Sequence, residues 1–167
     1  MFSCEPFVTE FDDLTDAIMY QAANKTSPQY DGTDIKVVTW NIRFGIARFP
    51  FFGDSCGESV ILDDAAIARN MQAISDLINV MDPDIVLLQE LDVSSKRTGY
   101  MDQVQYLLDN TNLNYGCYAS MWKADYIPSD GIGRIDAGNA ILSKYELTDA
   151  ERIQLRLRLD QDGLTKY

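Results

Sequence analysis

The residues Ile85-Val86-Leu87-Leu88 form an unbroken apolar run between Asp82-Pro83 and the polar pair Gln89-Glu90. A strand with one face in water alternates apolar and polar residues, so a run without alternation predicts a strand covered on both faces. Strands of this kind occur in layered folds, where other elements lie over each face of a sheet. The run therefore predicts a buried strand, and it places Gln89 and Glu90 at the end of that strand.

Other segments predict the elements around this strand. Residues 35–40 are apolar and β-branched and predict a buried strand that ends at Asn41. From the capping pair Asp63-Asp64, apolar residues recur at spacings of three and four as far as Met81, which predicts a helix that Asp82-Pro83 ends. Further elements are predicted over residues 100–111 (a helix), 139–143 (a strand) and 152–159 (a strand with strict polar and apolar alternation).

A loop rich in aromatic residues separates the first strand from the first long helix. Residues 44–62 contain four phenylalanines among glycines and a proline, which predicts irregular backbone. Because this loop follows Asn41, its aromatic rings are candidates for the lip of a substrate site that takes a lipid or a base. The alternative is that they pack against the flank of the domain.

Residues 1–34 are predicted to form an acidic segment that precedes the domain body at residues 35–167. This segment holds seven acidic residues and one lysine, so it carries -6 of the net charge of -12. Apolar side chains recur every four residues at Leu14, Ile18 and Ala22, which predicts a short amphipathic helix near residues 11–24 and a turn-rich link after it.

Charge and composition exclude several function classes. The chain has 14 basic and 26 acidic residues, which argues against broad attachment to nucleic acid or to an anionic membrane but leaves a local basic groove open. It contains no histidine, so a Ser-His-Asp triad, a Cys-His dyad or a His-ligated zinc cannot be built from this chain alone.

The three cysteines are far apart in the sequence and favour no zinc site. Ser3-Cys4 resembles the end of a bacterial lipoprotein signal, in which a small residue precedes a lipidated cysteine; the alternative is a surface cysteine near a disordered terminus. A lipidated Cys4 predicts membrane anchoring in the bacterial envelope, with periplasmic or outer-surface localisation. Cys56 and Cys117 are then either an oxidised pair or free buried thiols.

Two predicted strands end in side chains able to bind a metal ion or a phosphate. Asn41 follows residues 35–40 and Glu90 follows residues 85–88, so the two can meet at one edge of a sheet. A carboxylate at a strand end is a natural ligand for Mg²⁺, which prefers oxygen donors and takes few protein carboxylates. An amide beside it can bind a phosphate oxygen or orient the carboxylate. The alternative is that both are ordinary turn and surface residues.

Three segments in a fixed order carry a family resemblance: Thr39-Trp40-Asn41-Ile42-Arg43, then residues 82–90, then Gly138-Asn139-Ala140-Ile141-Leu142-Ser143. Together they resemble the N-terminal half of the endonuclease/exonuclease/phosphatase superfamily, the deoxyribonuclease I-like phosphoesterases. Arg97-Thr98-Gly99 and Asp102-Gln103 are similar to a linker in bacterial members. The resemblance covers residues 35–148.

The resemblance implies half of a four-layer α/β/β/α sandwich and a metal-dependent hydrolase of phosphoester bonds. Glu90 would bind the catalytic Mg²⁺ or Mn²⁺, and Asn41 would lie beside it and contact metal-bound groups or the scissile phosphate. Gln89 would support the site from behind. Asn139 would lie near the phosphate or fix a strand start, and Arg97 would approach a phosphate or be solvated.

The sequence also departs from the family pattern. The second half of the family domain supplies a Gly-Asp-x-Asn segment, a central histidine and an Asp-His pair, and none of them occurs here. We therefore expect an inactive fragment whose partner is the missing C-terminal half. Its substrate is expected to be a small or lipid-linked phosphoester rather than DNA. The alternative is a non-catalytic, acidic envelope lipoprotein that uses the scaffold as a binding module.

Overall fold

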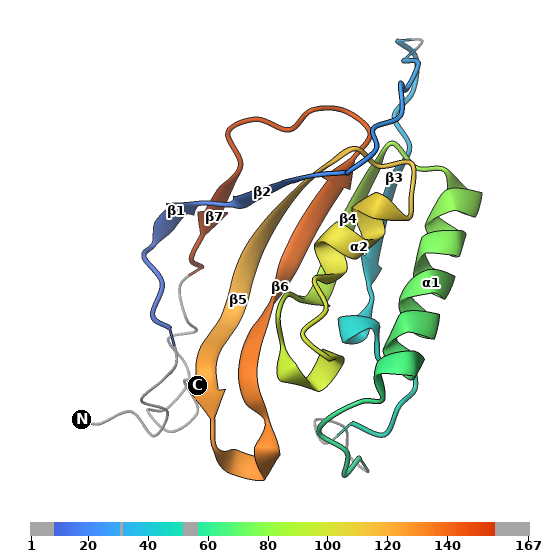
Figure 1. The fold of residues 1–167 in the computed structure, drawn as a ribbon. Helices are drawn as coiled ribbons and strands as arrows, with labels where there is room; N and C mark the ends of the chain where they lie inside the picture. The colour runs from blue at the N-terminus through green and yellow to red at the C-terminus, as the bar shows by residue number, and fades with distance from the viewer. Residues whose placement is uncertain (1–8, 31, 52–56, 156–167) are drawn as a thin grey trace.

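The computed structural model describes residues 9–30, 32–51 and 57–155 (Figure 1). Its main feature is a mixed sheet of five strands in the order β2-β5-β6-β4-β3. The strands are β2 (Ile18–Gln21), β3 (Val37–Asn41), β4 (Ile85–Asp92), β5 (Tyr115–Ile127) and β6 (Gly133–Ser143). β3 and β4 run parallel, and the other neighbours are antiparallel. The mixed sheet confirms the predicted α/β class.

Two helices, α1 (Asp64–Met81) and α2 (Gln103–Asp109), lie on the same side of the sheet (Figure 1). α1 begins as predicted, because the Asp63 carboxylate accepts a hydrogen bond from the Ala66 amide at 3.0 Å. It ends at Asp82, which adopts the left-handed conformation at φ 46° before the proline. Neither helix in the described ranges has the length and apolar character that crossing a membrane requires.

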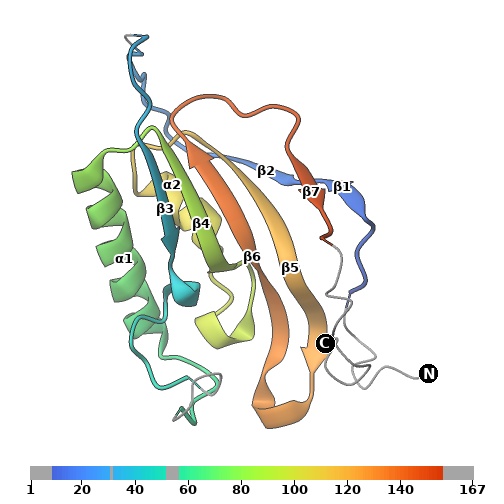
Figure 2. The ribbon, with the colours of Figure 1, turned by 180° about the vertical axis from the view of Figure 1, so that it is seen from behind.

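The helix-facing side of the sheet is the hydrophobic core, where Val86 and Leu88 of β4 are at most 1% exposed. The opposite face, called the open face below, has no helix over it in the described residues (Figure 2). Val37 is 53% exposed there, and Leu87 is half-buried. The prediction of strands buried on both faces is therefore wrong for the described structure, because the alternate side chains of β3 and β4 face outward.

The predicted helix near residues 11–24 is also wrong. The segment forms β1 (Leu14–Asp16) and β2, with β2 paired to β5 and β1 paired to β7 (Glu151–Ile153). Residues four apart share one side of a strand as well as one side of a helix, so the apolar spacing fits both structures. Backbone pairing with β5 decides between them. The N-terminal segment thus belongs to the sheets of the domain body.

The long hairpin of β5 and β6 was not predicted, apart from the last residues of β6. β5 mixes glycine, alanine, serine and lysine with its aromatic residues and has no clean alternation. Its approach to β6 requires a glycine, because a Cβ on Gly138 would lie 2.1 Å from the Ala119 carbonyl oxygen. The predicted strand at residues 152–159 is seen only as β7, and residues 156–159 lie outside the described ranges.

Short 3₁₀ turns complete the described structure: η1 (Arg43–Gly45), η2 (Lys96–Thr98) and η3 (Ser129–Gly131). The predicted helix at residues 100–111 is confirmed as the shorter α2, which starts after its N-cap residue Asp102. η1 follows the end of β3, and η2 follows the end of β4. These two turns therefore lie next to the residues predicted to carry the site.

Candidate functional site

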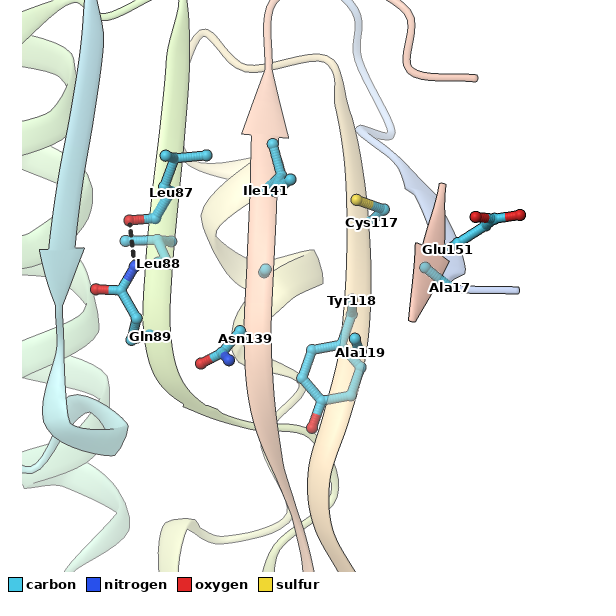
Figure 3. Close-up of a pocket in the computed structure, with 11 residues that line it drawn as sticks. Ala17, Leu87, Leu88, Gln89, Cys117, Tyr118, Ala119, Asn139, Ile141 and Glu151 are labelled. Atoms are coloured by element: carbon cyan, nitrogen blue, oxygen red, sulfur yellow. Dashed lines mark hydrogen bonds between the residues drawn. The ribbon is translucent and has the colours of Figure 1, made fainter. Parts of the chain in front are cut away.

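Three amide side chains come together on the open face from neighbouring strands. Asn41 of β3 is paired with Gln89 of β4. The antiparallel pairing of Leu88 with Ala140 brings Gln89 next to Asn139 of β6. Figure 3 shows Gln89 and Asn139 side by side on this face. The structure thus brings together three of the predicted site residues, which lie far apart in the sequence.

Asn41 ends β3 and starts the turn that follows. Its Oδ1 accepts a hydrogen bond from the Arg43 amide at 2.9 Å, while the side chain remains exposed. The Ile42 amide donates to the Gln89 carbonyl oxygen at 3.1 Å, which joins the residue after β3 to β4 beside its bulge. With Oδ1 engaged in the turn, the Nδ2 group of Asn41 is the part of the amide available to donate to a ligand.

Glu90 is the extra residue of a β-bulge. Leu88 pairs with Ala140 and Leu91 with Gly138, so Gln89 and Glu90 together oppose the single residue Asn139. The backbone of Glu90 is left-handed at φ 58°, which is uncommon for a residue other than glycine. The half-buried Glu90 carboxylate makes no hydrogen bond or ion pair with any residue that the structure describes. The bulge therefore presents a carboxylate without a described partner.

The donors present fit part of a Mg²⁺ or Mn²⁺ site. One carboxylate and neighbouring amide oxygens are hard ligands of the kind that Mg²⁺ takes, together with waters and substrate phosphates. Within residues 9–155 as described, no group of three or more His, Cys, Asp or Glu side chains could hold a metal ion. Among the residues that the structure describes, Glu90 is therefore a candidate for one ligand of a metal ion, and these residues alone do not complete such a site.

Gln89 and Asn139 also line a shallow depression of about 220 Å³ on the open face. Leu87, Cys117 and Ile141 are among its other walls (Figure 3), whereas Asn41 and Glu90 are not. Much of this lining is apolar, as expected of a sheet surface that another layer covers. We therefore do not assign the depression to catalysis.

Gln89 and Asn139, the two residues predicted to support the site, both lie within strands of the main sheet. Gln89 donates through Nε2 to the Thr39 hydroxyl at 3.3 Å and to the Leu87 carbonyl oxygen at 3.2 Å, which holds its amide against the sheet. Asn139 is exposed in the middle of β6, so the alternative that it fixes a strand start is wrong.

Two of the cysteine predictions fall on residues outside the described ranges, namely Cys4 and Cys56. Cys117 is a free, buried thiol on β5. Burial raises the pKa of the Cys117 thiol, which keeps it protonated.

Arg97 does not occupy a solvated loop. Its side chain is 3% exposed, and Nε and NH2 donate to the two carboxylate oxygens of Asp92, each at 2.7 Å. The guanidinium carbon lies 3.7 Å from the centroid of the Phe44 ring. The solvated alternative is therefore wrong, and contact with a phosphate would require Arg97 to leave a buried ion pair.

We expect Arg97→Met to destabilise the protein strongly, because it leaves the buried Asp92 carboxylate without its partner. Loss of one member of a buried pair costs about 3–5 kcal/mol. The exposed pair of Arg134 and Asp125 provides the control, with side chains 39% and 77% exposed; Arg134→Met should cost about 1 kcal/mol or less. Urea denaturation measures both, and equal shifts of the midpoint would contradict a stabilising role for Arg97.

The aromatic loop packs inward where the structure describes it. Phe51 is 7% exposed, and Phe44 and Phe49 are half-buried against the main core. Phe52 lies outside the described residues. The alternative that these rings pack against the domain is therefore confirmed for the described phenylalanines, and the substrate lip is wrong for them.

A buried polar cluster on β5 and β6 was not predicted from the sequence. Asp136, 4% exposed, accepts hydrogen bonds from the hydroxyl of Tyr118 at 2.9 Å and of Ser120 at 2.7 Å. Lys123 forms an ion pair with the same carboxylate at 3.2 Å. Burial is the main cause that raises the pKa of Tyr118, and the negative charge of Asp136 is the second. The Tyr118 phenol therefore stays protonated. The cluster ties the hairpin together; recognising it required the pairing of β5, which the sequence did not reveal.

Comparisons with known proteins identify the family of the chain. A crystal structure of an endonuclease/exonuclease/phosphatase from Beutenbergia cavernae DSM 12333 aligns at 18% identity and a TM-score of 0.40. The alignment covers 67% of this chain and only 26% of that chain. A search of curated proteins gave no match at the significance applied. The model of the endonuclease/exonuclease/phosphatase family matches residues 38–166, and the chain therefore belongs to this family.

Proposed function

We propose that this chain supplies one sheet and one metal ligand of a divalent-metal-dependent phosphoesterase. The observation that carries the proposal is the Glu90 carboxylate, which has no described partner and lies on a bulge one residue beyond the Asn41–Gln89 pair. Family membership implies hydrolysis of phosphoester bonds. The acidic, oxygen-donating end of β4 suits the cation that such chemistry uses.

In this proposal each residue has a distinct task. Glu90 and its neighbouring oxygens hold Mg²⁺ or Mn²⁺, which when bound supplies positive charge to the phosphate. Asn41 donates through Nδ2 to a phosphate oxygen, and Gln89 keeps the strand ends in register through Thr39. Asn139, which lies beside Gln89 on the neighbouring strand β6, contacts the same substrate in this proposal.

The proposed partner is the other half of the domain, which would cover the open face and complete an α/β/β/α sandwich. Three apolar side chains on β2, β3 and β6 are more than one-third exposed: Met19 at 48%, Val37 at 53% and Ile141 at 39%. A second sheet placed over this face would bury them. The covering half would also bring the general base that a chain without histidine lacks.

The proposed substrate is a small or lipid-linked phosphoester. A net charge of -12 repels a long polyanion such as DNA more than it repels a single phosphate group.

Anchoring through a lipidated Cys4 in a bacterial envelope remains part of the proposal, and Cys4 lies outside the described residues. Mass spectrometry of the mature N-terminus tests it: an acylated Cys4 supports the anchor, and a free thiol contradicts it.

We expect Asn41→Ala to lower kcat of the complete domain by roughly 10²–10³-fold with little change in KM, because the amide acts mainly on charge that develops at the phosphate. The exposed Asn79 on α1 provides the control, since its Nδ2 donates to the Asn110 carbonyl oxygen far from the site. Asn79→Ala should keep wild-type kcat. A loss of thermal stability in Asn41→Ala without a loss of kcat would show that Asn41 has only a structural role in the turn after β3.

A further inference from the structure

The backbone is strained on both sides of the candidate site. After Asn41 the chain turns through three consecutive residues with positive φ, Arg43 at 48°, Phe44 at 56° and Gly45 at 68°. On the neighbouring strand Glu90 has φ 58°. Such conformations are unfavourable for a residue other than glycine and persist only where the surroundings hold them. Tertiary contacts must therefore hold the turn after Asn41 and the bulge at Glu90 in these conformations.

Gln103 connects these two strained segments directly. Its side chain is completely buried at 0% exposure. Oε1 accepts a hydrogen bond from the Asp92 amide at 2.9 Å, two residues beyond Glu90. Nε2 donates to the Phe44 carbonyl oxygen at 2.7 Å, three residues beyond Asn41. A single side-chain amide thus joins the last residue of β4 to the turn after β3.

Arg97 makes a second connection between the same two places. Its guanidinium binds the Asp92 carboxylate on one side and lies over the Phe44 ring on the other. Thr98 adds a hydrogen bond from its hydroxyl to Asp92 at 3.0 Å. Contact is tight at Gly45, where a Cβ would lie 3.2 Å from Nε2 of Gln103 and 2.7 Å from the sulfur of Met71. We call Gln103, Arg97 and Asp92 the clasp.

We propose that Gln103 is a positioning residue of the phosphoesterase site, and that the clasp sets the distance and orientation between Asn41 and Glu90. The inference rests on the proposed function and assigns a task to the Arg97-Thr98-Gly99 and Asp102-Gln103 segment. The strand ends themselves are joined by the hydrogen bond from the Ile42 amide to the Gln89 carbonyl oxygen at 3.1 Å. Without the clasp this bond opens more often, and the two functional side chains separate.

The test compares Gln103→Met with a matched loss of a buried amide elsewhere. Asn114, 2% exposed, also connects separate segments: Oδ1 accepts from the Thr26 amide at 2.7 Å, and Nδ2 donates to the Lys144 carbonyl oxygen at 2.8 Å. It lies next to the start of β5, away from Asn41 and Glu90. Asn114→Met removes four hydrogen bonds of a buried amide, against two in Gln103→Met, without touching the clasp, so it is the more severe loss of the two.

Two readouts are made on the complete domain. In Gln103→Met the Ile42 amide should exchange with solvent about 10-fold faster or more, as expected for local opening. With Mg²⁺, kcat should fall roughly 10–100-fold while KM changes little, which is the size of effect that misplacement by about 1 Å produces. Asn114→Met should lower the melting temperature but leave both quantities at wild-type values.

If Gln103→Met does not fold, Gln103→Glu replaces it, since the carboxylate keeps an acceptor for the Asp92 amide. Intermediate effects on exchange and kcat are then expected. Wild-type exchange at Ile42 in the folded variant, or equal effects in Asn114→Met, would overturn the proposal. Absence of metal-dependent turnover in the wild-type domain would instead refute the proposed function, and the exchange measurement would still decide whether the clasp fixes the strand ends.

Discussion

Replacement of Glu90 by glutamine is expected to remove metal-dependent phosphoester hydrolysis from the complete domain, with kcat reduced by roughly 10³-fold and Mg²⁺ affinity weakened by at least about 10-fold. Glutamine keeps the size of the side chain but removes the negative charge that attracts the cation. Because the Glu90 carboxylate has no partner among the described residues, the substitution breaks no ion pair in the described structure. The loss should therefore appear in metal binding and turnover and not in stability.

Glu146→Gln is the matched control for this prediction. Glu146 is an exposed glutamate in the loop after β6, and its loss removes the same charge from the protein. Isothermal titration with Mn²⁺ and a turnover assay over a range of Mg²⁺ concentrations measure both variants. Wild-type metal dependence in Glu90→Gln would remove Glu90 from the site, and equal losses in both variants would indicate a nonspecific effect of charge.

The segments that the sequence predicted correctly carry strong local signals. The helix α1 has a capping aspartate, a long apolar period and a proline just after its end, so neighbouring residues alone determine it. The strand β4 contains the unbroken apolar run. By contrast, the chain near Leu14 and Ile18 fits a helix and a strand equally well, and only pairing with β5 and β7, about 100 residues or more away, makes it β-structure. Nonlocal pairing of this kind leaves little trace in local periodicity.

In the candidate site, too, some features could be predicted from local sequence and others depend on the tertiary fold. Asn41 and Glu90 were predicted because each follows an apolar run within a family motif. The bulge that presents Glu90 depends on the register between β4 and β6, which no local pattern specifies. Arg97 and Gln103 lie in the segment that resembled a bacterial linker, yet their roles depend on Asp92 and Phe44, which reach them through the tertiary fold. The sequence therefore named the candidate residues, but it did not show the hydrogen bonds and ion pair that surround them.

The 167-residue chain, purified alone, is expected to show no phosphoesterase activity with Mg²⁺ or Mn²⁺. The chain has no histidine to serve as general base. In the proposed site, Glu90 with the neighbouring amides of Asn41 and Gln89 supplies only part of the metal ligands, and a partial site binds weakly. The exposed apolar side chains of the open face, such as Val37 and Ile141, should also make the isolated chain prone to association.

The most direct test of the central claim is to measure solubility and phosphodiester turnover of this chain with and without the complementary half of the domain. The half is supplied as a second polypeptide or by restoring a longer reading frame, and light scattering and a Mg²⁺-dependent assay are run on the same samples. We predict an inactive, self-associating chain alone, and a monodisperse, active protein when the half is present. A monodisperse monomer of this chain that hydrolyses a phosphodiester in Mg²⁺ by itself would contradict the account, and a soluble, inactive monomer that gains nothing from the added half would favour a non-catalytic binding module.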